Sequence, residues 1–459
     1  MKTGKSQNLN KNESRGLYKK LITVALPIMA QNLISASLSL VDNLLVGNLG
    51  EVELATVGLG TQISFIFWMI LFGFCSGTIT YMAQFWGKKD LINMRRVAGI
   101  AATVSFGGGL IFAAASLFFP RYVLRIFTDI PEVLDMGTPF VRAGALIFLL
   151  WSIIVPCQAL LKASQQTKVP LIISLIAFSI NTILGFILIY GHLGMPKMGI
   201  MGAVTGVIIS RFIELALYIY VIFVRKNIVA GPIKEFFSWR GELFGRVVRN
   251  SVFTTLNEML WGFGTSMYNA AYGRIGVTEF AAVQAGNTIL NLFSLACFAT
   301  GDAMLILVGE KLGAGELKKA KNAASKLIRI TLIIGAFAGV LLFLTSRPIT
   351  SLFALTPDGV RYTILILTVY SCVLWLKVFN SGIITGVLRA GGDTRYAMIT
   401  EVSCVWLIGV PLAFICALVL HWPIYLVVLA VQAEELVKMF ILIRRYRKGK
   451  WVKDLVVDI

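Results

Sequence analysis

The chain has 459 residues, of which 57% are hydrophobic and only 14% charged, and its mean hydropathy is +0.80. Soluble globular domains are far less apolar, so this composition excludes one and indicates a multi-pass membrane protein. The net charge of +19 would suggest nucleic-acid binding in a soluble chain, but here the basic residues gather between apolar segments. We therefore expect membrane lipid as a partner and no nucleic acid.

Runs of about twenty apolar residues predict about twelve membrane-spanning helices. They lie near 21–46, 55–85, 97–119, 138–160, 170–191, 200–224, 247–273, 281–309, 326–346, 362–388, 396–420 and 423–443. Most of the 42 Lys and Arg fall in the two terminal tails and in every second loop. The positive-inside rule then predicts a cell-membrane protein with both termini in the cytoplasm.

The second half of the chain repeats the first. Two patterns, G-x-x-E-x-A-x-V and G-x-x-[DE]-L, each recur after 226 residues, and L-[KR]-A-x-x-x-T recurs after 227; they begin at 50 and 276, 87 and 313, and 161 and 388. Three matches in almost one register indicate two copies of a six-helix unit. An even number of helices gives both copies the same orientation, which predicts a pseudo-two-fold axis along the membrane normal.

The repeat predicts an all-α architecture with a substrate site between two lobes that rock against each other. We expect a cytoplasmic N-terminal tail, an N-lobe of helices 1–6, a cytoplasmic linker, a C-lobe of helices 7–12 and a cytoplasmic C-terminal tail. Their expected ranges are 1–20, 21–224, 225–246, 247–443 and 444–459.

The first predicted span carries a carboxylate, Asp42, with no basic residue near it in the sequence. A charged side chain at membrane depth is costly unless it faces a partner or a cavity, so it indicates a functional site. Polar residues recur along the same helix face: Gln31, Ser35, Ser39 and Asn43. Pro27 permits a bend in this helix. A bendable helix with a buried acid favours ion-coupled transport; the alternative is a solvated acid at the rim of a pore.

The seventh predicted span has a second acid, Glu258, on its own polar face. In the repeat register Asp42 aligns with Tyr268, and Glu258 aligns with Asn32. The two acids are therefore not equivalent, and they need not do the same job. We expect the coupling ion, Na⁺ or H⁺, to bind at Asp42, at Glu258 or at both, with Asn181 as an oxygen partner of Asp42.

Several other acids lie at membrane depth. Glu214 follows Arg211 by three residues, which favours a structural ion pair. Glu434 and Glu435 precede Lys438 near the inner end of the last span, and we interpret them as an interfacial cluster. We also expect Glu401 to pair with Lys377.

A wide cavity lined by polar and aromatic side chains would bind flat cationic molecules. Candidates for its lining are Gln31, Ser39, Trp68, Trp261, Tyr268 and Asn269. The chain has no phosphate-binding loop, so we expect neither ATP nor another cofactor, and no enzymatic activity.

The sequence resembles the MATE (multidrug and toxic compound extrusion) family over nearly its whole length. The matching residues are Ala25-Leu26-Pro27, Asp42-Asn43, Val46-Gly47, Asn181, Ile189-Tyr190-Gly191, Glu258 and 388–394. The resemblance implies twelve helices in two lobes that form a V, and export of cationic or amphipathic small molecules against inward flow of Na⁺ or H⁺. It also implies that Asp42 and Glu258 are the coupling acids of the two lobes and that Pro27 bends helix one.

Two departures from the family pattern thin the polar cluster around Asp42. Gly185 stands where many members have Asp or Asn, and Leu38 stands where some have Tyr. We expect a monomer. The alternative function is a flippase for lipids or lipid-linked oligosaccharides, which would need a basic cavity, and only Arg142, Arg211 and Lys377 are available to line one.

Overall fold

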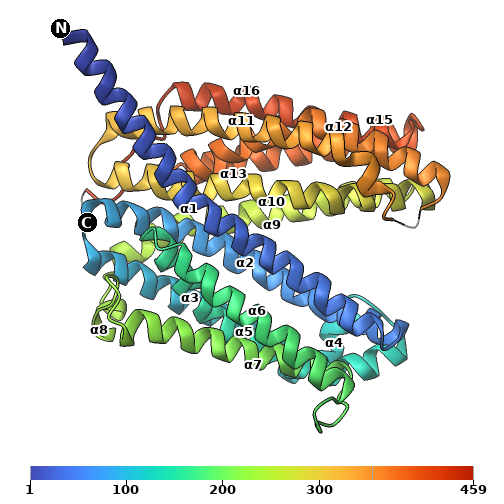
Figure 1. The fold of residues 1–459 in the computed structure, drawn as a ribbon. Helices are drawn as coiled ribbons and strands as arrows, with labels where there is room; N and C mark the ends of the chain where they lie inside the picture. Colours follow the sequence, from blue (N-terminus) through green and yellow to red (C-terminus); the bar gives the residue numbers. More distant parts are fainter. Residues whose placement is uncertain (1, 354, 458–459) are drawn as a thin grey trace. The chain divides into compact units, whose positions relative to one another are not determined.

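The computed structural model describes residues 2–353 and 355–457, which form helices joined by short loops, with no strand among them. The helices are α1 (Lys2–Gly47), α2 (Glu51–Lys88), α3 (Leu91–Phe118), α4 (Pro120–Arg125), α5 (Pro131–Ala163), α6 (Lys168–Tyr190), α7 (Ile200–Ile219), α8 (Ile233–Phe237), α9 (Gly241–Tyr272), α10 (Val277–Gly313), α11 (Leu317–Thr350), α12 (Pro357–Ser381), α13 (Thr394–Cys404), α14 (Val410–Phe414), α15 (Ile424–Val431) and α16 (Ala433–Arg447) (Figure 1). Four π-helical segments, η1 (Tyr220–Val224), η2 (Gly382–Leu388), η3 (Val405–Gly409) and η4 (Ile415–Val419), continue α7, α12, α13 and α14.

The all-helical class predicted from composition is confirmed. Within the described residues, ten helical segments are long and apolar enough to cross a membrane. The other two predicted spans, 247–273 and 423–443, are helical too, but they are not both long and apolar enough to be counted, for different reasons. Helix α9 carries polar side chains such as Asn257 and Glu258 along its length, and the span at 423–443 is divided at Gln432 into α15 and α16.

The helix boundaries follow the sequence repeat. Helices α2 and α10, α3 and α11, and α5 and α12 begin 226 residues apart, so each pair starts at equivalent positions. Gly50 and Gly276 precede α2 and α10, and the carboxylates of Glu53 and Glu279 lie back against them. The two halves are therefore copies of one structural plan as well as of one sequence pattern.

The described chain divides into two compact units, named here by the half that dominates each. The N-terminal unit comprises residues 30–82 and 90–255, and the C-terminal unit comprises 1–29, 83–89 and 256–459. In the N-terminal unit α3 packs on α5, α5 on α7 and α7 on α6. In the C-terminal unit α12 packs against α10, α11, α15 and α16. Each unit has its own core of buried apolar side chains.

The C-terminal unit contains a reciprocal contact between equivalent residues of the two repeats. A Cβ added to Gly87 would fall on the carbonyl oxygen of Glu310, and one added to Gly313 would fall on that of Gln84. Gln84 and Glu310 are themselves equivalent in the repeat register, as are the two glycines. Glycine is required at both places because the end of α2 and the end of α10 touch backbone to backbone.

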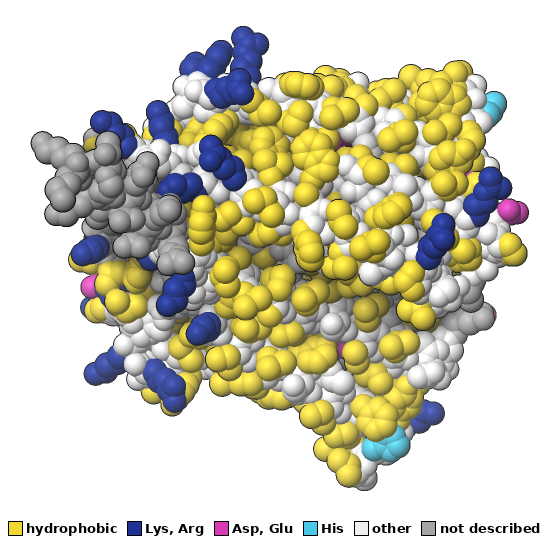
Figure 2. Space-filling model, turned by 45° about the horizontal axis from the view of Figure 1, so that its top comes forward, with side chains coloured by type: hydrophobic (Ala, Val, Ile, Leu, Met, Phe, Trp, Pro, Cys, Tyr) yellow, Lys and Arg dark blue, Asp and Glu magenta, His cyan; other side chains and the backbone are white. Residues whose placement is uncertain are grey.

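On the face drawn in Figure 2, hydrophobic side chains dominate, and most of the Lys and Arg side chains in view gather at the left edge. Exposed apolar side chains include Ile111, Phe118, Ile333, Phe337 and Leu407. Large exposed apolar surfaces mark contact with lipid or protein. This surface fits the multi-pass membrane protein that the composition predicts.

Candidate functional site

In the N-terminal unit, the structure brings Asp42 of α1 and Asn181 of α6 together. The Nδ2 of Asn181 donates a hydrogen bond of 2.9 Å to Oδ1 of Asp42, and Asn181 is buried while Asp42 is half-buried. Arg211, whose positive charge acts on Asp42, forms an ion pair with Glu214, as predicted. Within the described residues, no basic side chain forms an ion pair with Asp42.

The remaining polar residues of α1 are placed differently along the helix. Gln31 is buried, and its Nε2 donates a 3.0 Å hydrogen bond to Oγ of Ser174 on α6. Ser39 and Asn43, about two and three turns further on, are exposed. Pro27 lies inside the continuous helix α1. The predicted polar face therefore meets α6 at Gln31 and again at Asp42.

Gly185, one turn after Asn181 on α6, lies where α6 meets α1 and α7. A Cβ added there would lie 3.6 Å from the side chain of Leu45, and one added to Gly206 of α7 would lie 3.2 Å from the Gly185 nitrogen. The contact with Leu45 would be an ordinary one, so it is the missing side chain of Gly206 that lets α6 and α7 approach closely. Asp42 is left with Asn181 as its described hydrogen-bond partner.

In the C-terminal unit, Glu258 of α9 is paired with Arg389. The two side chains form an ion pair of 2.5 Å between Oε1 and Nη2, and Arg389 is only 2% exposed. No role for Arg389 follows from the sequence alone, although this residue stands in the repeated L-[KR]-A pattern, opposite Lys162 of the first half. A guanidinium thus neutralises this carboxylate, whereas Asp42 has an amide as its described partner.

The interpretation of Glu434, Glu435 and Lys438 as an interfacial cluster was wrong, because all three are buried. The Lys438 ammonium lies 3.2 Å from Glu435 and 4.0 Å from Glu434. Tyr268 donates a 2.6 Å hydrogen bond to Glu434, and Asn380 donates one of 2.7 Å to Glu435. Charged groups in the interior need this dense set of partners, which a spacing of three or four residues along the sequence does not reveal.

Glu401 of α13 accepts a 2.7 Å hydrogen bond from Nδ2 of Asn257 on α9. The expected pairing of Glu401 with Lys377 is wrong within the described residues: the Lys377 ammonium lies over the ring of Tyr370, 5.3 Å from its centroid. As in the pair of Asp42 and Asn181, a carboxylate here meets an amide and not a cation.

The other cavity candidates are spread over both units. Trp68 of α2 is exposed and stacks on Phe72 at 5.2 Å between ring centroids. Trp261 is exposed and Asn269 half-buried on α9, whereas Tyr268 is buried against Glu434. Exposure at these positions is compatible with a cavity lining, and Tyr268 instead joins the buried charge cluster.

Six acids of the membrane helices thus fall into two groups, according to the partner of each. The first has basic partners and includes Glu214, Glu258, Glu434 and Glu435. The second, Asp42 and Glu401, has amide partners. In the described part of the chain no three His, Cys, Asp or Glu side chains converge as metal ligands would.

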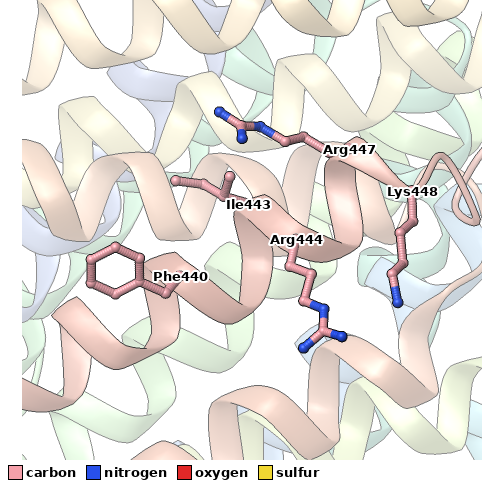
Figure 3. Close-up of a pocket in the computed structure, with 5 residues that line it drawn as sticks. All are labelled: Phe440, Ile443, Arg444, Arg447 and Lys448. Carbon is pink, nitrogen blue, oxygen red and sulfur yellow. The ribbon is translucent and has the colours of Figure 1, made fainter.

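A hollow on the outside of α16 is unrelated to these acids. It is lined by Phe440, Ile443, Arg444, Arg447 and Lys448, whose three cationic side chains fan out from the end of the helix (Figure 3). An apolar turn followed by a basic one is the pattern of a helix end at a membrane surface.

The family model described as MatE matches residues 27–187 and 251–415, one match in each half of the chain. The probable multidrug resistance protein NorM of Thermotoga maritima is 23% identical, over 98% of this chain and 96% of that protein. The NorM protein of Photorhabdus laumondii is 28% identical, over 87% and 88%. Multidrug-resistance relatives do not favour the flippase alternative.

Solved structures show the same fold. A MATE transporter in complex with MaL6 superimposes with a TM-score of 0.85 at 18% identity, over 95% of this chain and 97% of that one. A MOP-superfamily transporter from Pyrococcus furiosus gives 0.84 at 17% identity, over the same shares. The resemblance noted in the sequence is therefore confirmed, and the chain belongs to the MatE family of multi-pass membrane transporters.

Proposed function

We propose that this transporter is a proton-coupled antiporter that exports cationic or amphipathic small molecules from the cell, and that Asp42 is its coupling site. The observation that carries the proposal is the pair of Asp42 and Asn181, a carboxylate held by an amide inside the membrane helices. The multidrug-resistance names of its relatives support the substrate class.

An amide partner suits a carboxylate that gains and loses a proton. The amide NH₂ donates to the ionised acid, and after a half-turn of the side chain its carbonyl accepts from the neutral acid. In the structure Oδ1 of Asn181 is buried and has no hydrogen-bond partner among the described residues, so it is available for that second arrangement. A basic partner, by contrast, holds a carboxylate in its ionised form.

The same geometry supports a proton over Na⁺, because the described partner of Asp42 presents a donor to it and not an oxygen ligand. Asn181 turns its NH₂ group toward Asp42, and an NH₂ group cannot ligate a cation. Protonation would remove the charge of Asp42 and so favour one of two conformations over the other, which is how a bound ion drives alternating access. The protein works in the cell membrane as a monomer, with both termini in the cytoplasm.

The test is efflux of a fluorescent cationic dye from vesicles that contain the purified protein, with a pH gradient and a Na⁺ gradient imposed separately. We expect a response to the pH gradient alone, and loss of that response in Asp42→Asn. A response to Na⁺ alone would overturn proton coupling. Intact pH-driven efflux by Asp42→Asn would remove Asp42 from the mechanism.

A further inference from the structure

Two hydrogen bonds occupy the same position in the two halves of the chain. In the 226-residue register Gln31 aligns with Asn257, and in the 227-residue register of the pattern that begins at 161 and 388 Ser174 aligns with Glu401. The structure pairs Gln31 with Ser174 at 3.0 Å and Asn257 with Glu401 at 2.7 Å. An amide thus joins the equivalent helices in both halves, α1 to α6 and α9 to α13. The first half places a hydroxyl opposite the amide, and the second half places a carboxylate there.

The surroundings of Glu401 leave it without a cation of its own. Asn257 is 3% exposed, and its Oδ1 has no hydrogen-bond partner among the described residues. The charged groups that face Glu401 are Lys438 of α16, Arg389 and Glu258 of α9. Within the described residues each of these three has a closer ion-pair partner: Lys438 pairs with Glu435, and Arg389 pairs with Glu258.

We propose that Glu401, held by Asn257, is a second proton-binding site, located in the C-terminal unit where the first half has only a neutral amide–hydroxyl pair. The role of this site in transport rests on the proposed proton coupling. The protonation of Glu401 is inferred separately, from the geometry of its pair with Asn257. Glu401 repeats the arrangement of Asp42, on a different helix and at a position that is not equivalent to Asp42 in the repeat.

The chemistry balances without any further group. One proton from the aqueous phase converts the Glu401 carboxylate to the neutral acid. The Asn257 amide turns by a half-rotation, and the new O–H of the acid donates to its Oδ1, which is buried and unpartnered in the structure. Loss of the proton reverses both changes. Ser174 offers no ionisable group at the equivalent place, so the first half has no such exchange there.

Infrared difference spectroscopy of the purified full-length protein, titrated from neutral to acidic pH, tests this proposal without transport. The absorption of protonated carboxyl groups should contain one component that Glu401→Gln removes and another that Asp42→Asn removes. Glu401→Ser, which recreates the amide–hydroxyl pair of the first half, should remove the same component as Glu401→Gln. Ser174→Ala is the matched control and should leave both components in place.

A second measurement uses wild-type protein in which glutamate carries a ¹³C-carboxyl label and aspartate is unlabelled. It distinguishes the glutamate component from the aspartate component without a variant that could misfold. We expect the labelled component to shift and the Asp42 component to stay. A spectrum in which Glu401→Gln matches wild type throughout the titration would overturn the proposal, and so would the absence of any label-sensitive component.

Transport measurements separate this proposal from the proposed function. The number of protons exchanged per exported molecule, measured from the gradient that just stops dye efflux, should fall by one in Glu401→Gln. An unchanged number in that variant, with Asp42→Asn inactive, would refute the Glu401 site and leave proton coupling at Asp42 standing. Failure of wild type to respond to pH would refute proton coupling, while the infrared titration would still decide the protonation of Glu401.

Discussion

The two units differ in how they hold their acids, although their sequences repeat in one register. In the N-terminal unit the coupling candidate Asp42 meets the amide of Asn181, its one hydrogen-bond partner among the described residues. In the C-terminal unit Glu258 is held by Arg389, and Lys438 lies between Glu434 and Glu435. These acids stand at non-equivalent positions of the repeat and have different partners, and the partner of an acid is a better guide to its role than its depth in the membrane.

The largest expected effect comes from removing the cation that serves two acids. Lys438→Met leaves Glu434 and Glu435 buried without their ammonium, and breaking a buried ion pair in this way costs about 3–5 kcal/mol. We expect a large fall in the thermal unfolding temperature in detergent, followed by tryptophan fluorescence. The triple variant Lys438→Met/Glu434→Gln/Glu435→Gln removes all three charges and should recover much of the lost unfolding temperature. A stable Lys438→Met would show that this cluster is not structural.

Arg389→Met should have a similar but smaller effect, because Glu258 is more exposed than the acids beside Lys438. The double variant Arg389→Met/Glu258→Gln removes both charges and should be more stable than Arg389→Met alone. The same unfolding assay measures both. If the double variant is no better than the single one, the ion pair is not what makes Arg389 important.

Removing the amides should have moderate effects in both units. Asn181→Leu and Asn257→Leu each take one hydrogen bond from a membrane-depth acid, at a cost of about 1–3 kcal/mol. Efflux driven by a pH gradient should slow in both. Unchanged efflux in Asn181→Leu, with normal folding, would contradict the role given to the amide.

The smallest expected effect comes from the neutral pair of Gln31 and Ser174. Ser174→Ala removes one hydrogen bond from Gln31, at a cost of about 1 kcal/mol, and takes away no charge. We expect a small drop in unfolding temperature and an unchanged response to a pH gradient. Loss of the pH response in this variant would mean that coupling in the N-terminal unit extends beyond Asp42.

Much of the fold could be predicted from the sequence, because apolar runs, basic loops and a repeat are local patterns. The helix pairs that start 226 residues apart confirm that register. The proximity of Asp42 and Asn181 was also predicted, although with the oxygen of Asn181 as the partner, whereas its NH₂ group faces Asp42. The spans that the apolar criterion misses are those whose polar residues, or whose break at Gln432, lower their hydropathy.

The partners of the C-terminal acids could not be predicted in the same way. Arg389 reaches Glu258 from 131 residues away, and Asn257 reaches Glu401 from 144. Such pairings depend on how helices pack, whereas spacing along one helix made Glu434, Glu435 and Lys438 resemble an interfacial cluster. The repeat could have predicted one of these contacts. Gln31 aligns with Asn257 and Ser174 aligns with Glu401, so the same contact is expected in both halves.

The most direct test of the central claim compares two acids in one assay. Efflux of a cationic dye driven by a pH gradient is measured in vesicles for Asp42→Asn and Glu258→Gln, with equal amounts of folded protein inserted. We predict that Asp42→Asn abolishes the response to the gradient and that Glu258→Gln retains it. Retained coupling in Asp42→Asn together with its loss in Glu258→Gln would contradict the division between amide-held and base-held acids.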